Sequence, residues 1–183
     1  APIVTPILAD LKMSYGEMGM TLGSWQLVYI PMSIIAGIAM DKWGIRKTMF
    51  AGALMIALSE GLRYFATGFV NFLPMVALFG IGGPLISIGA PKAVSLWFKG
   101  NDRATAVGIY TTAPWIGGLF AIAATNSLIM PLTGQSWRLT FALYSVFALL
   151  CAFVWWLFAR DTRASENQNK SSIWAVFLKL IKL

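Results

Sequence analysis

Three ionisable side chains stand inside long apolar stretches of this 183-residue chain: Glu60, Arg63 and Lys92. A charge at membrane depth is a functional hypothesis by default, since lipid cannot solvate it. At that depth Glu60 could carry a coupling proton, and either Arg63 or Lys92 could bind an anionic substrate. The chain has no histidine and one cysteine, Cys151, which excludes histidine-ligated metals, histidine proton relays and a disulfide within the chain. We expect no metal and no cofactor.

Each of these charges also has a structural explanation. Glu60 and Arg63 are three residues apart, so they could neutralise each other along one helical face. Lys92 precedes Lys99 by seven residues and therefore lies about 10 Å below the membrane surface, at 1.5 Å per helical residue. Its aliphatic stem could reach the headgroups, or its ammonium could face a central cavity. Both alternatives stay open.

Uncharged polar side chains interrupt the same apolar stretches. Tyr29, Tyr110 and Thr111 could supply the few polar contacts that orient a ligand, and hydrogen bonds between helices would explain them equally well. Pro84 and Pro91 lie close to Lys92 and would leave backbone carbonyls free there. We take Tyr29, Tyr110 and Thr111 as substrate-binding candidates beside Lys92 and Arg63.

The elements that must position these residues are membrane-spanning helices. Hydrophobic residues make up 58% of the chain and charged residues 11%, against about 25% charged in soluble domains. The apolar runs are near the 20 residues that cross a bilayer. We predict an all-α polytopic bundle over 1–160, with spans at about 21–40, 48–67, 72–97, 104–130 and 137–158. Residues 161–183 form a cytoplasmic loop followed by the start of a connecting or next helix, which could instead lie on the inner leaflet.

Basic residues set the orientation of the bundle. They gather after alternate spans, and the side that carries more of them faces the cytoplasm of a bacterial-type inner membrane. That side has eight: Lys42, Arg46, Lys47, Lys99, Arg103, Arg160, Arg163 and Lys170; the other side has Lys12 and Arg138. Because the net charge of +7 is divided among short clusters, it does not form a nucleic-acid surface. Membrane lipid is the expected surrounding.

One cytoplasmic turn has a specific pattern of small, acidic and basic residues. It contains Gly37, Asp41, Lys42, Gly44, Arg46 and Lys47. Gly37 would permit close helix approach, Gly44 a tight reversal, and Asp41 could cap a helix or pair with Arg46. The spacing resembles the signature loop between helices 2 and 3 of the major facilitator superfamily, with departures at Ala39 and Met40. The resemblance implies a cytoplasmic gate that locks against a C-terminal half.

Further stretches extend the resemblance over essentially the whole chain. Trp97-Phe98 with Asp102-Arg103 looks like the turn after helix 4, and Trp137-Arg138 like the start of helix 6. The resemblance makes residues 1–8 the end of a truncated helix 1, within an N-terminal six-helix half. Helix 4 would line the cavity and helix 3 would be peripheral. Softer matches at Gly61-Leu-Arg63, Pro91-Lys92 and Gly108 to Thr112 are similar to cyanate-permease-like members.

Pro114, Gly117 and Gly118 resemble part of an antiporter signature on helix 5. Proline would bend the helix and the glycines would admit a close neighbour, so plain helix packing is the simpler interpretation.

We expect a secondary transporter that moves a small solute by alternating access. The cavity cation favours a small anion, and entry against a negative-inside potential favours proton symport. Efflux of drugs or hydrophobic cations is the alternative, and a non-transporting membrane scaffold is the competing class. An enzyme is not expected, because Glu60 is the one acid at membrane depth and a dyad needs two.

Overall fold

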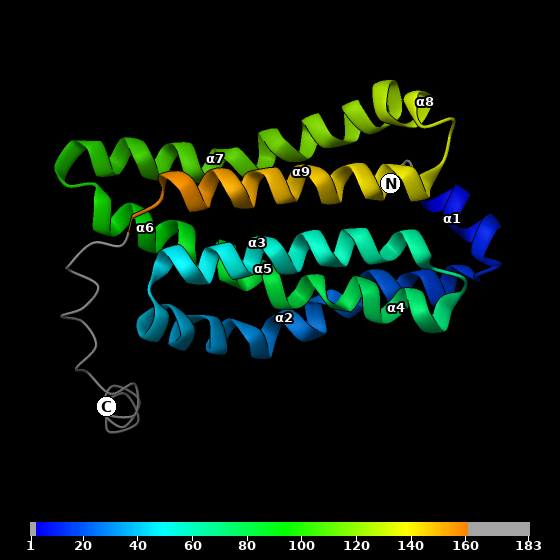
Figure 1. Cartoon of the computed structure of the whole chain (residues 1–183), viewed down its shortest axis with the longest axis horizontal. Helices are drawn as coiled ribbons and strands as arrows, with labels where there is room; N and C mark the ends of the chain where they lie inside the picture. The colour runs from blue at the N-terminus through cyan, green and yellow to red at the C-terminus, as the bar shows by residue number, and fades with distance from the viewer. Residues whose placement is uncertain (1–2, 161–183) are drawn as a thin grey trace.

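The computed structural model describes residues 3–160, and every regular element in that range is helical. This confirms the all-α fold. The elements run along one long axis (Figure 1). They are α1 (Val4–Leu11), α2 (Tyr15–Trp43), α3 (Ile45–Leu62), η1 (Arg63–Phe65), α4 (Phe69–Ala77), α5 (Phe79–Ser87), α6 (Gly89–Trp97), α7 (Gly100–Ala124), η2 (Thr125–Ile129), α8 (Met130–Leu132) and α9 (Trp137–Phe158).

Four stretches of described helix are long and apolar enough to cross a membrane: Tyr15–Trp43, Phe69–Trp97, Gly100–Leu132 and Trp137–Phe158. The remaining expected span, 48–67, corresponds to α3 with η1, which includes Arg46, Lys47 and Glu60 near its ends. The division into spans and a cytoplasmic loop stays a prediction. The loop and the helix expected over 161–183 lie outside the described residues.

Short polar signals set where the helices begin. Ser14 caps α2: its Oγ accepts from the Glu17 amide at 3.2 Å, while its own amide donates to the Glu17 carboxylate at 2.8 Å. This reciprocal pair starts α2 at Tyr15, six residues before the apolar run suggested. Ser136 caps α9 in the simpler way, accepting from the Leu139 amide. Gly44, at φ 83°, joins α2 to α3 without a loop, as the tight reversal required.

The span expected as one helix over 72–97 is divided into three pieces. Prolines at 74, 84 and 91 lack the amide that would bond the carbonyl four residues earlier, and their rings crowd that carbonyl. The helical hydrogen-bond pattern is interrupted at Leu78, between α4 and α5, and at Ile88, between α5 and α6, although both residues keep helical backbone angles and Phe69–Trp97 remains one membrane-length stretch. The second interruption lies between Ser87 and Gly89, one turn before Lys92.

The packed part of the bundle consists of α2, α3, α4 to α6 and α9. α5 lies against both α2 and α3 at two glycines, where side chains would not fit. A methyl carbon at Gly80 would overlap the Trp25 carbonyl oxygen, and one at Gly82 would lie 2.5 Å from the Gly52 carbonyl oxygen. Such backbone-to-backbone contact is how helices associate in lipid, where the hydrophobic effect gives little drive.

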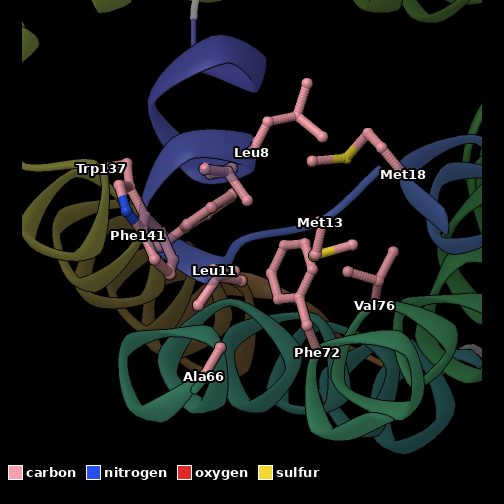
Figure 2. Close-up of a cluster of buried hydrophobic side chains, with 10 residues drawn as sticks. Leu8, Leu11, Met13, Met18, Ala66, Phe72, Val76, Trp137 and Phe141 are labelled. Carbon is pink, nitrogen blue, oxygen red and sulfur yellow. The ribbon is translucent and has the colours of Figure 1, made fainter. Parts of the chain in front are cut away.

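The outer end of the bundle, opposite the basic turns, is closed by α1. Ile7, Leu8 and Leu11 of α1 lie among buried side chains from α2, α4, α9 and the turn after η1 (Figure 2). Asp10 accepts hydrogen bonds from the Trp137 indole at 3.0 Å and from Arg138, whose other nitrogen donates to the Ala66 carbonyl at 2.8 Å. Polar and apolar contacts together therefore attach α1 to the start of α9.

α7 differs from the other long helices, because nearly all its side chains are exposed and Ala124 is its one buried residue. Its far end continues into η2, a π-helical turn, and there it is attached to α9 through the Thr125 and Tyr144 hydroxyls. The turns that join α2 to α3 and α6 to α7 lie with the end of α9 at one end of the bundle (Figure 1). The described basic clusters thus share one end, as the positive-inside pattern requires.

Candidate functional site

A polar seam runs between α2 and the broken helix α5–α6. We use this name for Tyr29, Asp41, Ser87 and Lys92. The hydroxyls of Tyr29 and Ser87 are 2.5 Å apart, joining residues 58 positions apart in the chain. The Tyr29 ring lies against Gly83, where a Cβ would be 3.3 Å from it, and makes an edge contact with Trp25. Tyr29, a substrate-binding candidate, is thus held by α5 with its hydroxyl at the helix interruption.

Lys92 forms an ion pair with Asp41. The sequence had placed Asp41 in the gate motif and Lys92 among the substrate-binding candidates, so this pairing joins two sets of residues that were predicted separately. The Lys92 ammonium donates to Asp41 Oδ1 from α6 to the last turn of α2. The lysine side chain is 23% exposed and the aspartate side chain 44%. Lys92 is therefore neither an isolated cation in lipid nor a free headgroup anchor. Whether its ammonium also faces a solute cavity stays a prediction.

The remaining gate-motif residues divide between the turn and α9. Arg46 donates to the Trp156 carbonyl at 2.7 and 3.3 Å, and its guanidinium lies over the Trp156 ring. Lys42 and Lys47 are exposed. The close helix approach expected at Gly37 is not found among the described residues: a Cβ there would meet no heavy atom within 4 Å, because no described helix packs on that side of α2.

Glu60 and Arg63 form the pair within one helix that their spacing allowed. Arg63 donates to Glu60 at 3.0 Å and to the Ser59 hydroxyl at 3.1 Å, and its guanidinium lies 4.9 Å from the centre of the Phe141 ring. Their side chains are only 14% and 10% exposed. The Arg63 Nε atom is buried and has no hydrogen-bond partner among the described residues. Both candidates are thus bound to each other and packed against α9.

The candidates on α7 are not brought to the polar seam by any described hydrogen bond. Thr111 donates within its own helix, to the Val107 carbonyl at 2.8 Å, and Tyr110 is partly exposed. α7 continues through Pro114 as one helix. A Cβ at Gly117 or Gly118 would meet nothing within 4 Å, so the close packing expected there has no partner in the described part of the chain.

Two polar contacts were not anticipated from the sequence. Ser87 was not a candidate, although it lies five residues before Lys92 in a stretch rich in proline and glycine. Asp10 was treated as part of a connector, yet it binds both Trp137 and Arg138. Over residues 3–160, no group of three or more acids, cysteines or histidines is placed to hold a metal ion.

Comparison with known proteins places this arrangement among transporters. The chain is 28% identical over 160 residues to the hexuronate transporter of Bacillus subtilis (strain 168), covering 87% of this chain and 37% of that protein. It is 24% identical over 167 residues to the D-galactonate transporter of Escherichia coli O6:H1, covering 91% of this chain and 38% of that protein. It is 30% identical over 158 residues to the probable anion transporter 2, chloroplastic, of Oryza sativa subsp. japonica, covering 83% of this chain and 28% of that protein.

The chain therefore spans about two fifths of the length of the bacterial relatives, and the finer likeness to cyanate permeases stays a prediction. The model of the Major Facilitator Superfamily matches residues 1–183 in full. With its all-helical bundle and its apolar spans, the chain belongs to the major facilitator superfamily, a family of membrane transporters and not of enzymes.

Proposed function

We propose that the chain forms the N-terminal half of a secondary transporter that moves a small organic anion of the sugar-acid type by alternating access between two halves. The observation that carries the proposal is the Lys92 ammonium on α6. It lies at the polar seam, beside a broken helix, with Asp41 as its counter-ion. Discontinuous helices at membrane depth are where transporters of this kind place solute sites.

The relatives support an anionic cargo. Two are named for hexuronate and D-galactonate, and a third for an anion. A sugar acid needs one cation for its carboxylate and several hydroxyl partners for its ring or chain. Lys92 provides the cation at Asp41, and Tyr29 with Ser87 provides hydroxyls farther along α2, 12 residues or about 18 Å of helix away. The remaining contacts would come from the half of the protein that completes the gate.

Arg63 is the weaker candidate for the cargo. Its guanidinium already has Glu60, Ser59 and the Phe141 ring as partners, and all of them lie on the packed side of α3. An anion would have to displace a carboxylate three residues away on the same helix, and that carboxylate would then be left buried without a counter-charge. We therefore assign cargo binding to Lys92.

Proton symport follows from the energetics of an anionic cargo. One negative charge entering a cell at a negative-inside potential of 100 mV costs about 2.3 kcal/mol, which a co-transported proton offsets. Glu60 stays the coupling candidate in the described half because it is an acid at membrane depth. Its protonation would release Arg63. Glu60→Gln is expected to uncouple uptake from the proton gradient, provided that the protein still folds.

Uptake into proteoliposomes tests the function. The full-length gene product would be reconstituted and offered labelled D-galacturonate, D-galactonate, cyanate and a lipophilic cation, with and without an inward proton gradient. Saturable sugar-acid uptake that rises with the gradient supports the proposal. Uptake of the lipophilic cation alone would favour drug efflux, and no movement of any probe would favour a scaffold.

Lys92→Gln would be compared with Lys99→Gln, which removes the same charge from an exposed lysine seven residues away. Loss of uptake in Lys92→Gln alone assigns the cargo to the seam. Equal uptake in both variants would mean that Lys92 does not bind cargo.

A further inference from the structure

We propose that Asp41 is a built-in competitor for the cargo at Lys92, so that a bound anion releases the gate carboxylate from α6. The inference rests on the proposed function, since it requires an anionic cargo at Lys92. It joins two features that the sequence presents separately: a gate turn at the end of α2 and a cation on α6. The ion pair between them makes one lysine part of both.

The pair is placed so that it can exchange partners. Asp41 is the one ion-pair partner of Lys92 among the described residues. An ammonium has three donor hydrogens, so an arriving carboxylate can bind before Asp41 leaves. The Asp41 side chain is 44% exposed, so water can solvate it once it is released. The contrast is Glu60, whose side chain is 14% exposed and would be left without water.

The backbone around the pair is tightly packed, so the exchange needs only the side chains to move. Gly89 lies tightly against Met40 and Met49, where a Cβ would be 3.2 Å or less from their side chains. Ala93, next to Lys92, is buried with Ile45 and Met49 of α3. α6 is therefore packed closely against α2 and α3 beside the ion pair. What changes on exchange is the charge–charge contact between α6 and the last turn of α2.

The exchange couples cargo to gate. While Asp41 is paired with Lys92, the Asp41 carboxylate is not available to the other half of the protein. Once an anion binds Lys92 in its place, the carboxylate becomes available. By thermodynamic reciprocity, whatever binds released Asp41 strengthens cargo binding by the same factor. Occupancy at the seam thus biases the cytoplasmic end of the transporter without any movement of α6.

Equilibrium binding of D-galacturonate to the purified full-length gene product in nanodiscs tests the competition. We expect Asp41→Asn to bind the sugar acid about three- to tenfold more tightly than the parent, because the internal competitor has lost its charge. Asp41→Glu keeps the charge and should restore the parent affinity. Asp102→Asn, which removes an exposed acid in the first turn of α7 on the same side of the membrane, should leave the affinity unchanged.

Exchanging the charges of Asp41 and Lys92 distinguishes competition for the cargo from a purely structural ion pair. In the double variant Asp41→Lys with Lys92→Asp, the pair can re-form and thermal stability should return, but the cation is now on α2 and cargo affinity should stay low. Recovery of both stability and affinity would overturn the proposal. So would a parent-like or weaker affinity in Asp41→Asn. If the parent itself binds neither D-galacturonate nor D-galactonate, the proposed function fails first, and this inference fails with it.

Discussion

Two ion pairs of this helical bundle, Glu60–Arg63 and Asp41–Lys92, are built in opposite ways. Glu60 and Arg63 are three residues apart on one helical stretch, almost wholly buried, with Ser59 and Phe141 as further partners. Asp41 and Lys92 are 51 residues apart on two helices and remain partly exposed. The first pair is a local unit attached to α9, whereas the second joins two elements.

The difference separates a charge pair that packing holds in place from one that can change partners when cargo binds. A pair within one helical stretch keeps its geometry whatever the helices do, so it cannot register their movement. A pair between two helices changes whenever either end finds a better partner. Burial strengthens the contrast, because a buried ion without its partner is far more costly than an exposed one. We therefore expect stability to depend on Arg63 and cargo binding to depend on Lys92.

The largest expected effect is on stability at Arg63. Arg63→Gln leaves the Glu60 carboxylate buried without a counter-charge and should cost about 3–5 kcal/mol of folding free energy. Adding Glu60→Gln removes the orphaned charge and should recover much of that loss. Thermal unfolding and the monodisperse fraction in detergent measure both. An Arg63→Gln protein as stable as the parent would abolish the contrast between the two pairs.

Lys92→Gln should show the opposite profile. Both partners of this pair are partly exposed, so the melting temperature should change by only a few degrees. Sugar-acid uptake should fall by roughly tenfold or more, equivalent to about 1.4 kcal/mol or more of lost cargo binding. Initial uptake rates in proteoliposomes check this at matched protein orientation. Loss of folding with loss of uptake would instead make Lys92 a second structural charge.

Tyr29→Phe tests whether the polar seam extends beyond the ion pair. The variant removes the hydrogen bond to Ser87. It should weaken cargo binding by about 0.5–1.5 kcal/mol, which would be measured as a several-fold rise in the KM for the sugar acid. Tyr64→Phe is the matched control, because Tyr64 lies at the outer end with its ring against Phe65. Equal kinetic parameters in the two variants would restrict the seam to Lys92 and Asp41.

The smallest effect should come from Asp10→Asn. This change weakens a third ion pair, at the outer end, where Arg138 keeps its bond to the Ala66 carbonyl and its position over the Trp137 ring. We expect a loss of less than about 1 kcal/mol of folding free energy and unaltered uptake, because the pair is partly exposed. A marked loss of uptake, measured beside Lys92→Gln, would show that the outer end also takes part in transport.

Local sequence patterns predicted local structure well. Apolar runs indicated the helices, the three-residue spacing of Glu60 and Arg63 allowed their pairing, and glycine at position 44 allowed the reversal. Their causes lie within one helical turn or one tight turn, where spacing alone determines which side chains meet. Even so, three prolines divided the span over 72–97 more thoroughly than hydropathy indicated.

Long-range contacts were not accessible in the same way. No spacing rule links Asp41 to Lys92 or Tyr29 to Ser87, because these pairs depend on how α2 crosses the broken helix at Gly80 and Gly89. For Gly37, Gly117 and Gly118 the close packing stays a prediction. Glycine in an apolar helix predicts a close neighbour, but only the neighbours in the described residues can be tested, and none of them lies there.

The π-helical turn at Thr125–Ile129 bears on how this family varies in length. A π turn holds one residue more than an α turn, so it absorbs a single insertion without disturbing the helix on either side. Removing one residue there would restore an ordinary turn and rotate the rest of the segment by about 100°, separating Met130 and Thr133 from Thr140 on α9. We therefore expect one-residue gaps in aligned transporters to fall within these five positions, accompanied by compensating changes along α9.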